Sequence, residues 1–321
     1  MSKPIAFEIP FFEELGESRS VLIAGAGGGF DIFSGLPLYF TLRESGRDVH
    51  LANLSFSSLI PSVGRWLTPT LVEVTADSEG YAYYFPEQVL SAWFRTQGDE
   101  VPIYSFHRQG VKPLLAGYQK LVEELGVDTV ILVDGGTDSL MRGDEAGLAT
   151  PSEDMASIAA VHQLDVPRKL LACLGFGVDW YHGVCHAQAL EAVADLTRGG
   201  GFLGAVSLVN SMPAVDRYIE ACRWVRSGMK EEVASIVCGS ILSALEGRFG
   251  AYHSTQRTSG NSVWINPLMT FYWCFHLQAV AERVLYLDRI LDTETYEEVM
   301  YAIRAFRGKC PDVRSWDDIP I

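Results

Sequence analysis

The sequence predicts an α/β fold: a doubly wound, mostly parallel, Rossmann-like sheet with an inserted hairpin and a helical C-terminal part. Short apolar runs alternate with helix-length segments from residue 20 to residue 208, as in parallel sheets that are covered by helices on both faces. The first apolar run leads directly into a cluster of four glycines, which is typical of the ligand-binding turn in such sheets. Beyond Met212 the pattern is helical.

The elements follow from this pattern in chain order. Pro86 and Pro151 each begin a helix, and Gly126 ends one. Residues 71–85 alternate and turn near Gly80, which predicts the inserted hairpin. The expected strands are 21–24, 48–54, 101–106, 128–134, 169–174 and 202–208, and the expected helices between them are 31–42, 86–96, 111–125, 151–163 and 184–196.

The chain is expected to form one structural unit with two parts. Residues 1–211 would form a Rossmann-like core that binds a nucleotide or phosphosugar, and residues 212–321 a helical part packed on that core. The run from Leu268 to Leu291 is apolar on most faces, so we expect a buried helix there, with a homo-oligomer interface as one use for it. The expected C-terminal helices are 213–226, 231–246, 267–291 and 295–306.

Composition excludes several classes of function. The chain has 321 residues and a formal net charge of -15, and basic residues are not gathered in a run, so we expect no nucleic-acid partner. The six cysteines form no Cys-x-x-Cys pair, which indicates free thiols. No segment offers the roughly 18 uninterrupted apolar residues of a membrane span, so we expect a cytoplasmic protein without a membrane partner.

The glycine turn is the first candidate binding element. Gly25, Gly27, Gly28 and Gly29 free the backbone to approach a ligand, and a helix that starts at Asp31 would add unpaired amides suited to phosphate. A glycine-rich turn that binds nothing is the alternative.

Two positions argue against a nicotinamide dehydrogenase. The dinucleotide fingerprint requires glycine where this chain has Phe30. The acidic residue that holds a ribose hydroxyl is also replaced, since Asn53 stands at the end of the second strand. Binding of another nucleotide or of a phosphosugar remains compatible with both positions.

The loop after the fourth strand is the second candidate. Its acids could chelate Mg²⁺ or another divalent cation, with Asp138 and Asp144 as ligands, or hold ribose hydroxyls, while Arg142 meets a phosphate. A solvated acidic loop that caps turns is the alternative. The candidate residues of this loop are Asp134, Gly135, Gly136, Thr137, Asp138, Arg142, Asp144 and Glu145.

Two histidines are four residues apart, at His182 and His186. On a helix both rings would lie on one face, and with Asp179 or Cys185 they could hold a transition metal. A second interpretation is that one of them acts as a general acid or base near the ligand, and a third is that a histidine caps or packs at a helix start. A polar stretch at residues 252–261, which includes Arg257, is expected to fold over the edge of the sheet.

Four segments resemble motifs of the uncharacterised DUF1152 family, over most of residues 15–290: Gly25-Ala-Gly-Gly-Gly-Phe-Asp31, Val133-Asp-Gly-Gly-Thr-Asp138, Gly143-Asp-Glu-Ala-Gly-Leu148 and Thr150-Pro-Ser-Glu-Asp154. The resemblance implies no activity. It implies that six acids belong to shared motifs: Asp31, Asp134, Asp138, Asp144, Glu145 and Asp154.

These features favour a hydrolase or group transferase that acts on a nucleotide, nucleoside or phosphosugar, with N-glycosidic cleavage as one reaction. Asp134 or Asp138 would position a water or hydroxyl, and His182 or His186 would protonate the leaving group. A non-catalytic nucleotide sensor that uses the same loops is the alternative.

Overall fold

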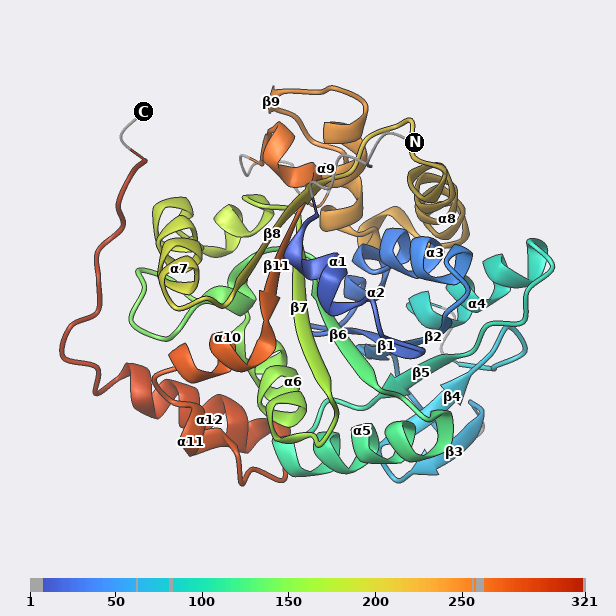
Figure 1. The fold of residues 1–321 in the computed structure, drawn as a ribbon, viewed down its shortest axis with the longest axis horizontal. Coiled ribbons are helices and arrows are strands. Elements are labelled where there is room, and N and C mark those ends of the chain that lie inside the picture. The colour runs from blue at the N-terminus through green and yellow to red at the C-terminus, as the bar shows by residue number, and fades with distance from the viewer. Residues whose placement is uncertain (1–7, 62, 81–82, 256, 258–262, 320–321) are drawn as a thin grey trace, which may run out of the picture.

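A single large sheet runs through the computed structural model, which describes residues 8–61, 63–80, 83–255, 257 and 263–319 (Figure 1). The strand order is β3-β4-β5-β2-β1-β6-β7-β11-β8. A separate two-stranded sheet pairs β9 (Gly250–Ala251) with β10 (Trp264–Ile265). The strands of the large sheet are β1 (Ser20–Gly25), β2 (Asp48–Leu54), β3 (Arg65–Thr68), β4 (Leu71–Val74), β5 (Ile103–Phe106), β6 (Thr129–Asp134), β7 (Arg168–Leu174), β8 (Phe202–Ser207) and β11 (Phe271–His276).

The centre of the sheet is the parallel array β5-β2-β1-β6-β7. Every residue of β1 and β6 is buried, because helices cover both faces and leave no solvent side on which polar residues could alternate. The chain moves from β1 through β2 to β5, then returns to the other side of β1 as β6. The chain thus reverses the strand order at the adjacent strands β1 and β6. In such sheets ligands bind beyond the carboxyl ends of the strands at this switch point.

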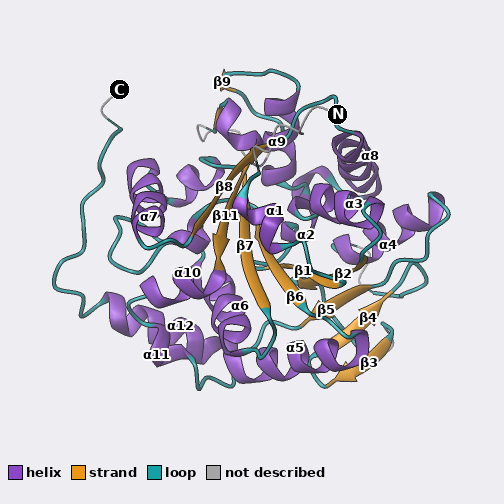
Figure 2. Cartoon of the chain, viewed as in Figure 1, coloured by secondary structure: helices purple, strands orange, loops and turns teal. Residues whose placement is uncertain are grey.

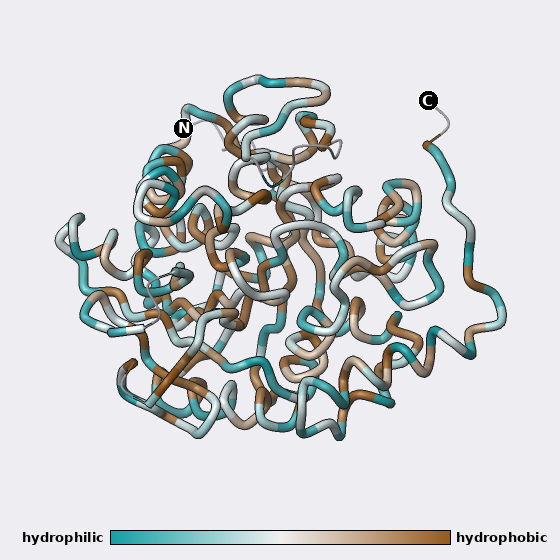
Figure 3. Tube along the Cα trace, turned by 180° about the vertical axis from the view of Figure 1, so that it is seen from behind, coloured by the Kyte–Doolittle hydropathy of each residue, from teal (hydrophilic) through white to brown (hydrophobic). Residues whose placement is uncertain are grey.

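Helices pack on the sheet in two layers, with the orange strands of Figure 2 between them. Hydrophobic (brown) stretches pass through the middle of the molecule in Figure 3. Among the described residues, none of the helices combines the length and hydrophobicity needed to cross a bilayer. One layer contains α1 (Pro10–Glu14), α2 (Asp31–Ser34), α3 (Leu36–Glu44), α4 (Pro86–Thr96), α8 (Pro213–Gly228) and α9 (Ile236–Leu245); the other contains α5 (Val111–Leu125), α6 (Pro151–Gln163), α7 (His186–Arg198), α10 (Leu277–Arg283), α11 (Leu287–Ile290) and α12 (Tyr296–Arg307).

The predicted fold class is confirmed. The second strand and the helix that begins at Pro151 have the predicted bounds. The predicted helix 31–42 is divided at Gly35 into α2 and α3. A Cβ on Gly35 would lie 2.6 Å from Cγ2 of Ile23 in β1, so a side chain at this break would collide with the sheet.

The predicted helix 267–291 is wrong. A short 3-10 helix (Pro267–Thr270) leads into β11, and only then does α10 begin. β11 lies antiparallel between β7 and β8, inside the sheet. The apolar residues of β11 run continuously from Phe271 to Phe275 without alternating with polar residues. Periodicity alone cannot distinguish such a run from a segment of a buried helix. Tyr272, Cys274 and Phe275 are thus buried within the chain's own sheet, and Phe271 and Trp273 are partly buried.

The predicted hairpin is misplaced by one strand. The partner of β4 is β3, which precedes it, and the Arg65 guanidinium meets the Glu73 carboxylate across the pair at 2.5 Å. On its other side β4 pairs antiparallel with β5. Of the expected second arm, residues 81 and 82 lie outside the described residues, and Tyr83 to Phe85 precede α4 without forming a strand.

The segment after residue 211 is not a separate helical layer. Helices α8 and α9 lie in one layer, α10 to α12 lie in the other, and β11 joins the sheet. After α12 the chain runs along α7 as an extended segment (Figure 1). The expected helical C-terminal part is therefore built into both faces of the core.

Candidate functional site

The glycine turn follows β1 and bends sharply against the end of β2. Gly28 and Gly29 have φ angles of +90° and +63°, the left-handed region that favours glycine. A Cβ on Gly28 would lie 2.8 Å from the Leu54 carbonyl oxygen, and the Gly29 amide donates to that same oxygen at 3.1 Å. Both glycines are thus required by the turn itself.

The carboxylate of Asp31 occupies the place where we expected a phosphate. It accepts hydrogen bonds from the Gly27 amide at 2.7 Å and from the Gly135 amide at 3.3 Å. Helix α2, which Asp31 begins, is only four residues long. The turn is therefore filled by the chain's own negative charge, and its amides do not form an open anion site.

The loop after β6 positions two more carboxylates. Asp134, the last residue of β6, accepts from the Ser139 hydroxyl at 2.5 Å and from the Ser139 amide at 3.3 Å. Asp138 accepts from the amide and the hydroxyl of Thr150, both at 3.3 Å. These bonds tie the loop to itself and to the start of α6.

Gly136 and Thr137 position Asp179 but do not line the cavity. The Thr137 amide donates to the Asp179 carboxylate at 2.7 Å. A Cβ on Gly136 would lie 2.0 Å from the same oxygen, so only glycine permits this approach. Asp179 belongs to the short helix Val178–His182 that follows β7.

Five aspartates meet at the carboxyl edge of the sheet, and we call them the aspartate cluster: Asp31, Asp134, Asp138, Asp154 and Asp179. They line a cavity of about 510 Å³, here called the edge cavity, whose wall also includes Gly27, Gly28, Gly29 and Gly135. Four of the five aspartates are at most 7% exposed. Among the described residues, no basic side chain forms an ion pair with any member of the cluster.

Burial raises the pKa of every carboxyl in the aspartate cluster, and the charge of another cluster member raises the pKa of Asp31, Asp134, Asp154 and Asp179 further. Loss of water is the largest cause in each case. For Asp31, Asp154 and Asp179, the charges of Asp134 and Asp138 raise the pKa further. The pKa of Asp134 rises to about 7. Ionisation of the cluster is therefore costly without a ligand, and a bound cation or hydroxyl donors would relieve the repulsion between the ionised carboxylates.

Arg142, Asp144 and Glu145 do not line the edge cavity. The Arg142 guanidinium pairs with the Asp144 carboxylate at 2.8 Å. Glu145 is fully buried, and its carboxylate accepts from the Arg142 amide at 2.9 Å and the Gly143 amide at 2.8 Å. Arg314, from the C-terminal segment, pairs with Asp144 at 3.0 Å. Residues 142–145 thus have a structural role in this loop. Of the two expected metal ligands, Asp138 lines the edge cavity and Asp144 does not.

The two histidines are not on one helix face. His182 ends the short helix after β7, and Gly183, with φ +96°, separates it from α7, which His186 begins. His182 is exposed and lines the edge cavity. His186 lies outside the lining, packs on Phe176 with ring centroids 5.4 Å apart, and has its pKa lowered by burial. A metal site shared by these two histidines is not formed.

Gly25 and Asn53 support the turn from behind. Asn53 is fully buried and donates to the Gly29 carbonyl at 2.8 Å and to the Glu87 carboxylate at 2.9 Å. A Cβ on Gly25 would lie 2.2 Å from the Asn53 side-chain oxygen. Asn53 is therefore placed to fix the glycine turn, and neither residue lines the edge cavity.

Aromatic and basic side chains form the rim of the edge cavity. Phe56, Tyr84 and Tyr181 line it together with Arg108 and Arg257. The Arg108 guanidinium lies over the Phe56 ring, 5.2 Å from its centroid. Arg257 belongs to the polar stretch expected to fold over the edge, of which residues 256 and 258–261 lie outside the described part. Four of the clustered aspartates are buried, whereas Phe56 and Arg108 are exposed, so the cavity has an acidic floor with an aromatic and basic rim. Glu153 and Glu232 also line the cavity, and the Glu153 carboxylate lies 3.8 Å from the Arg108 guanidinium.

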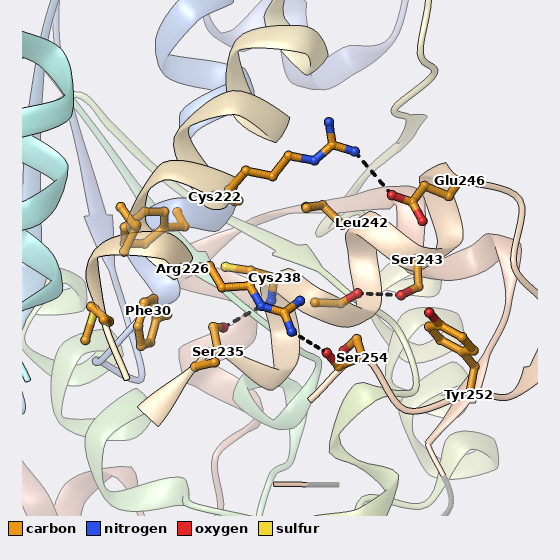
Figure 4. Close-up of a pocket in the computed structure, with 16 residues that line it drawn as sticks. Phe30, Cys222, Arg226, Ser235, Cys238, Leu242, Ser243, Glu246, Tyr252 and Ser254 are labelled. Carbon is orange, nitrogen blue, oxygen red and sulfur yellow. Dashed lines mark hydrogen bonds and ion pairs between the residues drawn. The ribbon is translucent and has the colours of Figure 1, made fainter. Parts of the chain in front are cut away.

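A second cavity, of about 330 Å³, lies between α8 and α9 and shares Phe30 and Ser235 with the edge cavity (Figure 4). Its charged side chains are paired with other residues of its own lining. Arg226 donates to the Ser254 carbonyl at 2.9 Å, and Arg223 pairs with Glu246 at 3.2 Å. The aspartates of the edge cavity, in contrast, have no basic ion-pair partner among the described residues, so the edge cavity is the stronger candidate site.

Together the fold and the site define a Rossmann-like α/β protein with an acidic cavity at the switch point of its sheet. A family model described as "Protein of unknown function (DUF1152)" matches residues 67–309. This range is most of the chain, so the chain belongs to the DUF1152 family. No curated protein matches it. The matched range contains four of the clustered aspartates, whereas the glycine turn and Asp31 precede it.

Sequence reasoning missed part of this site. Asp154 was assigned only to a shared motif, although it lies in the first turn of a correctly predicted helix. Arg108 was not considered, yet it follows β5 at the carboxyl edge. The rule that ligands bind beyond the carboxyl ends of parallel strands could have found Arg108. No local signal reveals that Asp154 reaches back to the glycine turn.

Proposed function

We propose that this protein is a hydrolase or group transferase that acts on a nucleotide, a nucleoside or a phosphosugar bound in the edge cavity. The main support for the proposal is the composition of the cavity, which combines an acidic floor with an aromatic and basic rim. Its volume of about 510 Å³ is in the range of small-molecule sites.

Each part of the cavity suits one part of such a ligand. Carboxylates accept hydrogen bonds from sugar hydroxyls. The rings of Phe56, Tyr84 and Tyr181 offer stacking surfaces for a planar base. Arg108 and Arg257 at the rim supply the positive charge for a phosphate. The sequence places the phosphate at the glycine turn, but the Asp31 carboxylate occupies that turn. We therefore propose that the phosphate binds at the rim.

The acidic floor suits cleavage of an N-glycosidic bond. Negative charge beside the sugar stabilises the oxocarbenium ion that develops as the bond breaks. Asp138 would position the attacking water or hydroxyl, and the rim residue His182 would protonate the leaving group. His186 does not line the cavity, so we assign this role to His182 alone.

A thermal-shift screen followed by product analysis tests the proposal. Nucleotides, nucleosides, ADP-ribose-like compounds and phosphosugars are added with and without Mg²⁺, and stabilising compounds are then incubated and examined for products. We expect at least one compound to raise the Tm and to be turned over, and Asp138→Asn to reduce turnover at least 100-fold while it still binds. The exposed Asp216→Asn is the matched control and should keep full activity.

Binding without turnover by the wild type would contradict the catalytic proposal and favour the nucleotide sensor. Absence of any stabilising compound would contradict both. A ligand at 100 times its Kd stabilises the folded state by about 2.7 kcal/mol, which is a readily measured change in Tm.

A further inference from the structure

We propose that Asp31, Asp134 and Asp154 bind one divalent cation of the Mg²⁺, Mn²⁺ and Ca²⁺ class at the floor of the edge cavity. The inference deepens the proposed function and rests on it for the ligand that the cation would meet. Each of the three residues offers a carboxylate oxygen, and these oxygens lie within 4.8 Å of one another. This ligand set differs from the Asp138 and Asp144 pair that the sequence predicted.

The spacing suits a cation of this class. Two oxygens on opposite sides of Ca²⁺ are about 4.8 Å apart, and around Mg²⁺ they are about 4.2 Å apart, from metal–oxygen distances of about 2.4 and 2.1 Å. All three donors are oxygens, which favours these hard cations over Zn²⁺. Water molecules would complete the coordination on the side open to the cavity, as Mg²⁺ commonly retains several.

An unpartnered oxygen of Asp154 points to a missing ligand. The side chain is 1% exposed, and its Oδ1 has no hydrogen-bond partner. A buried carboxylate oxygen without a partner is costly. A cation bound at this oxygen would supply the missing interaction.

Gly27 leaves room for this arrangement. A Cβ at Gly27 would lie 2.7 and 2.8 Å from the two oxygens of Asp154 and 2.9 Å from Oδ2 of Asp31. The Asp154 carboxylate thus faces the glycine turn beside Asp31. Since Gly27 is not among the glycines with positive φ, the space around it explains the glycine where its backbone conformation does not.

The other two carboxylates are held in place by hydrogen bonds. The amides of Gly27 and Gly135 orient Asp31, and Ser139 orients Asp134. Each carboxylate oxygen has two lone pairs, so these bonds leave capacity for a metal. Partners of this kind behind the ligands are typical of metal sites in proteins.

Titration of the 321-residue chain with Mn²⁺ in the absence of substrate tests the inference. After EDTA treatment and dialysis, free Mn²⁺ is followed by electron paramagnetic resonance, and Mg²⁺ or Ca²⁺ is added as a competitor. We expect one Mn²⁺ per chain. Asp154→Asn and Asp31→Asn should each raise the Kd at least tenfold, whereas the exposed control Asp288→Asn should leave it unchanged.

A second pair of measurements shows whether the variants are folded. Circular dichroism should match the wild type, and Mn²⁺ should raise the Tm of the wild type and of Asp288→Asn but not that of Asp154→Asn. Lack of saturable Mn²⁺ binding by the wild type, or wild-type affinity in folded Asp154→Asn and Asp31→Asn, would overturn the inference.

The two proposals fail separately. Saturable Mn²⁺ binding with no turnover of any compound would retain the cation site and reject the enzyme. Turnover that is unaffected by EDTA, with no Mn²⁺ bound, would retain the enzyme and reject the cation site.

Discussion

At the scale of single residues, several glycines and polar side chains at the site are explained by their neighbours. Gly27 gives the clearest test. We expect Gly27→Ala to weaken Mn²⁺ binding at least tenfold, because its Cβ would crowd the Asp154 and Asp31 oxygens at 2.7 to 2.9 Å. The measurement is the same Mn²⁺ titration. Gly199→Ala is the matched control, since φ there is -83° and the nearest atom would be 3.6 Å away. Equal affinities in the two variants would contradict the proposed ligand arrangement.

Asn53 is the second residue-scale test. Asn53→Ala removes the hydrogen bonds to the Gly29 carbonyl and the Glu87 carboxylate. We expect the free energy of unfolding to fall by about 1–3 kcal/mol, because buried polar groups lose their partner. Urea denaturation measures the change. Adding Glu87→Gln should recover part of the loss, because a neutral amide then replaces the buried carboxyl whose pKa burial raises. A single variant as stable as the wild type would show that the turn does not depend on Asn53.

At the scale of elements, the ends of β1 and β6 and the start of α6 bring like charges together. A carboxyl whose folded-state pKa is raised contributes stability that is fully present below its unfolded-state pKa of about 4 and is lost as pH rises through the folded-state value. For Asp134 that value is about 7. We therefore expect the metal-free protein to lose stability between pH 5 and pH 8.

The comparison with Asp134→Asn isolates this effect. In EDTA, the decrease in Tm from pH 5 to pH 8 should be smaller in Asp134→Asn than in the wild type. Histidines with lowered pKa, such as His50 and His107, act with the opposite sign, but they are common to both proteins. Identical pH profiles would show that the Asp134 carboxyl titrates in the folded state as it does in the unfolded chain.

At the scale of the whole molecule, the C-terminal segment after residue 310 contacts both the loop after β6 and helix α7. Arg314 pairs with Asp144 at 3.0 Å and with the buried Glu145 at 3.3 Å, and the Gln188 side chain donates to the Ser315 carbonyl at 3.0 Å. We expect removal of residues 311–321 to lower the free energy of unfolding by about 1–3 kcal/mol, because partly buried charges lose their partner.

Mn²⁺ affinity should be unaffected by the same truncation, since the segment does not line the edge cavity. Arg314→Met should reproduce most of the loss of stability, and the exposed control Lys309→Met should not. A truncated chain as stable as the wild type would reject this role for the segment. Loss of Mn²⁺ binding on truncation would show that the segment also supports the site.

The sequence by itself determined the parallel centre of the sheet and the side of it on which the site lies. The continuous apolar runs of β1 and β6 are local signals, and polar residues that follow such strands must emerge at the same edge. Hence Asp31, Asp134 and Asp138 were correctly placed near one another from the sequence.

Only the tertiary structure decided which acids meet and where the apolar segment near the C-terminus lies. Asp134 and Asp144 belong to one loop, yet the first faces the edge cavity and the second pairs with Arg142 and Arg314. Asp154 joins Asp31 across more than 100 residues of chain. The segment Phe271–His276 forms the strand β11 because its backbone pairs with β7 on one side and with β8 on the other. Each of these outcomes depends on contacts between distant segments, which no local pattern of residues encodes.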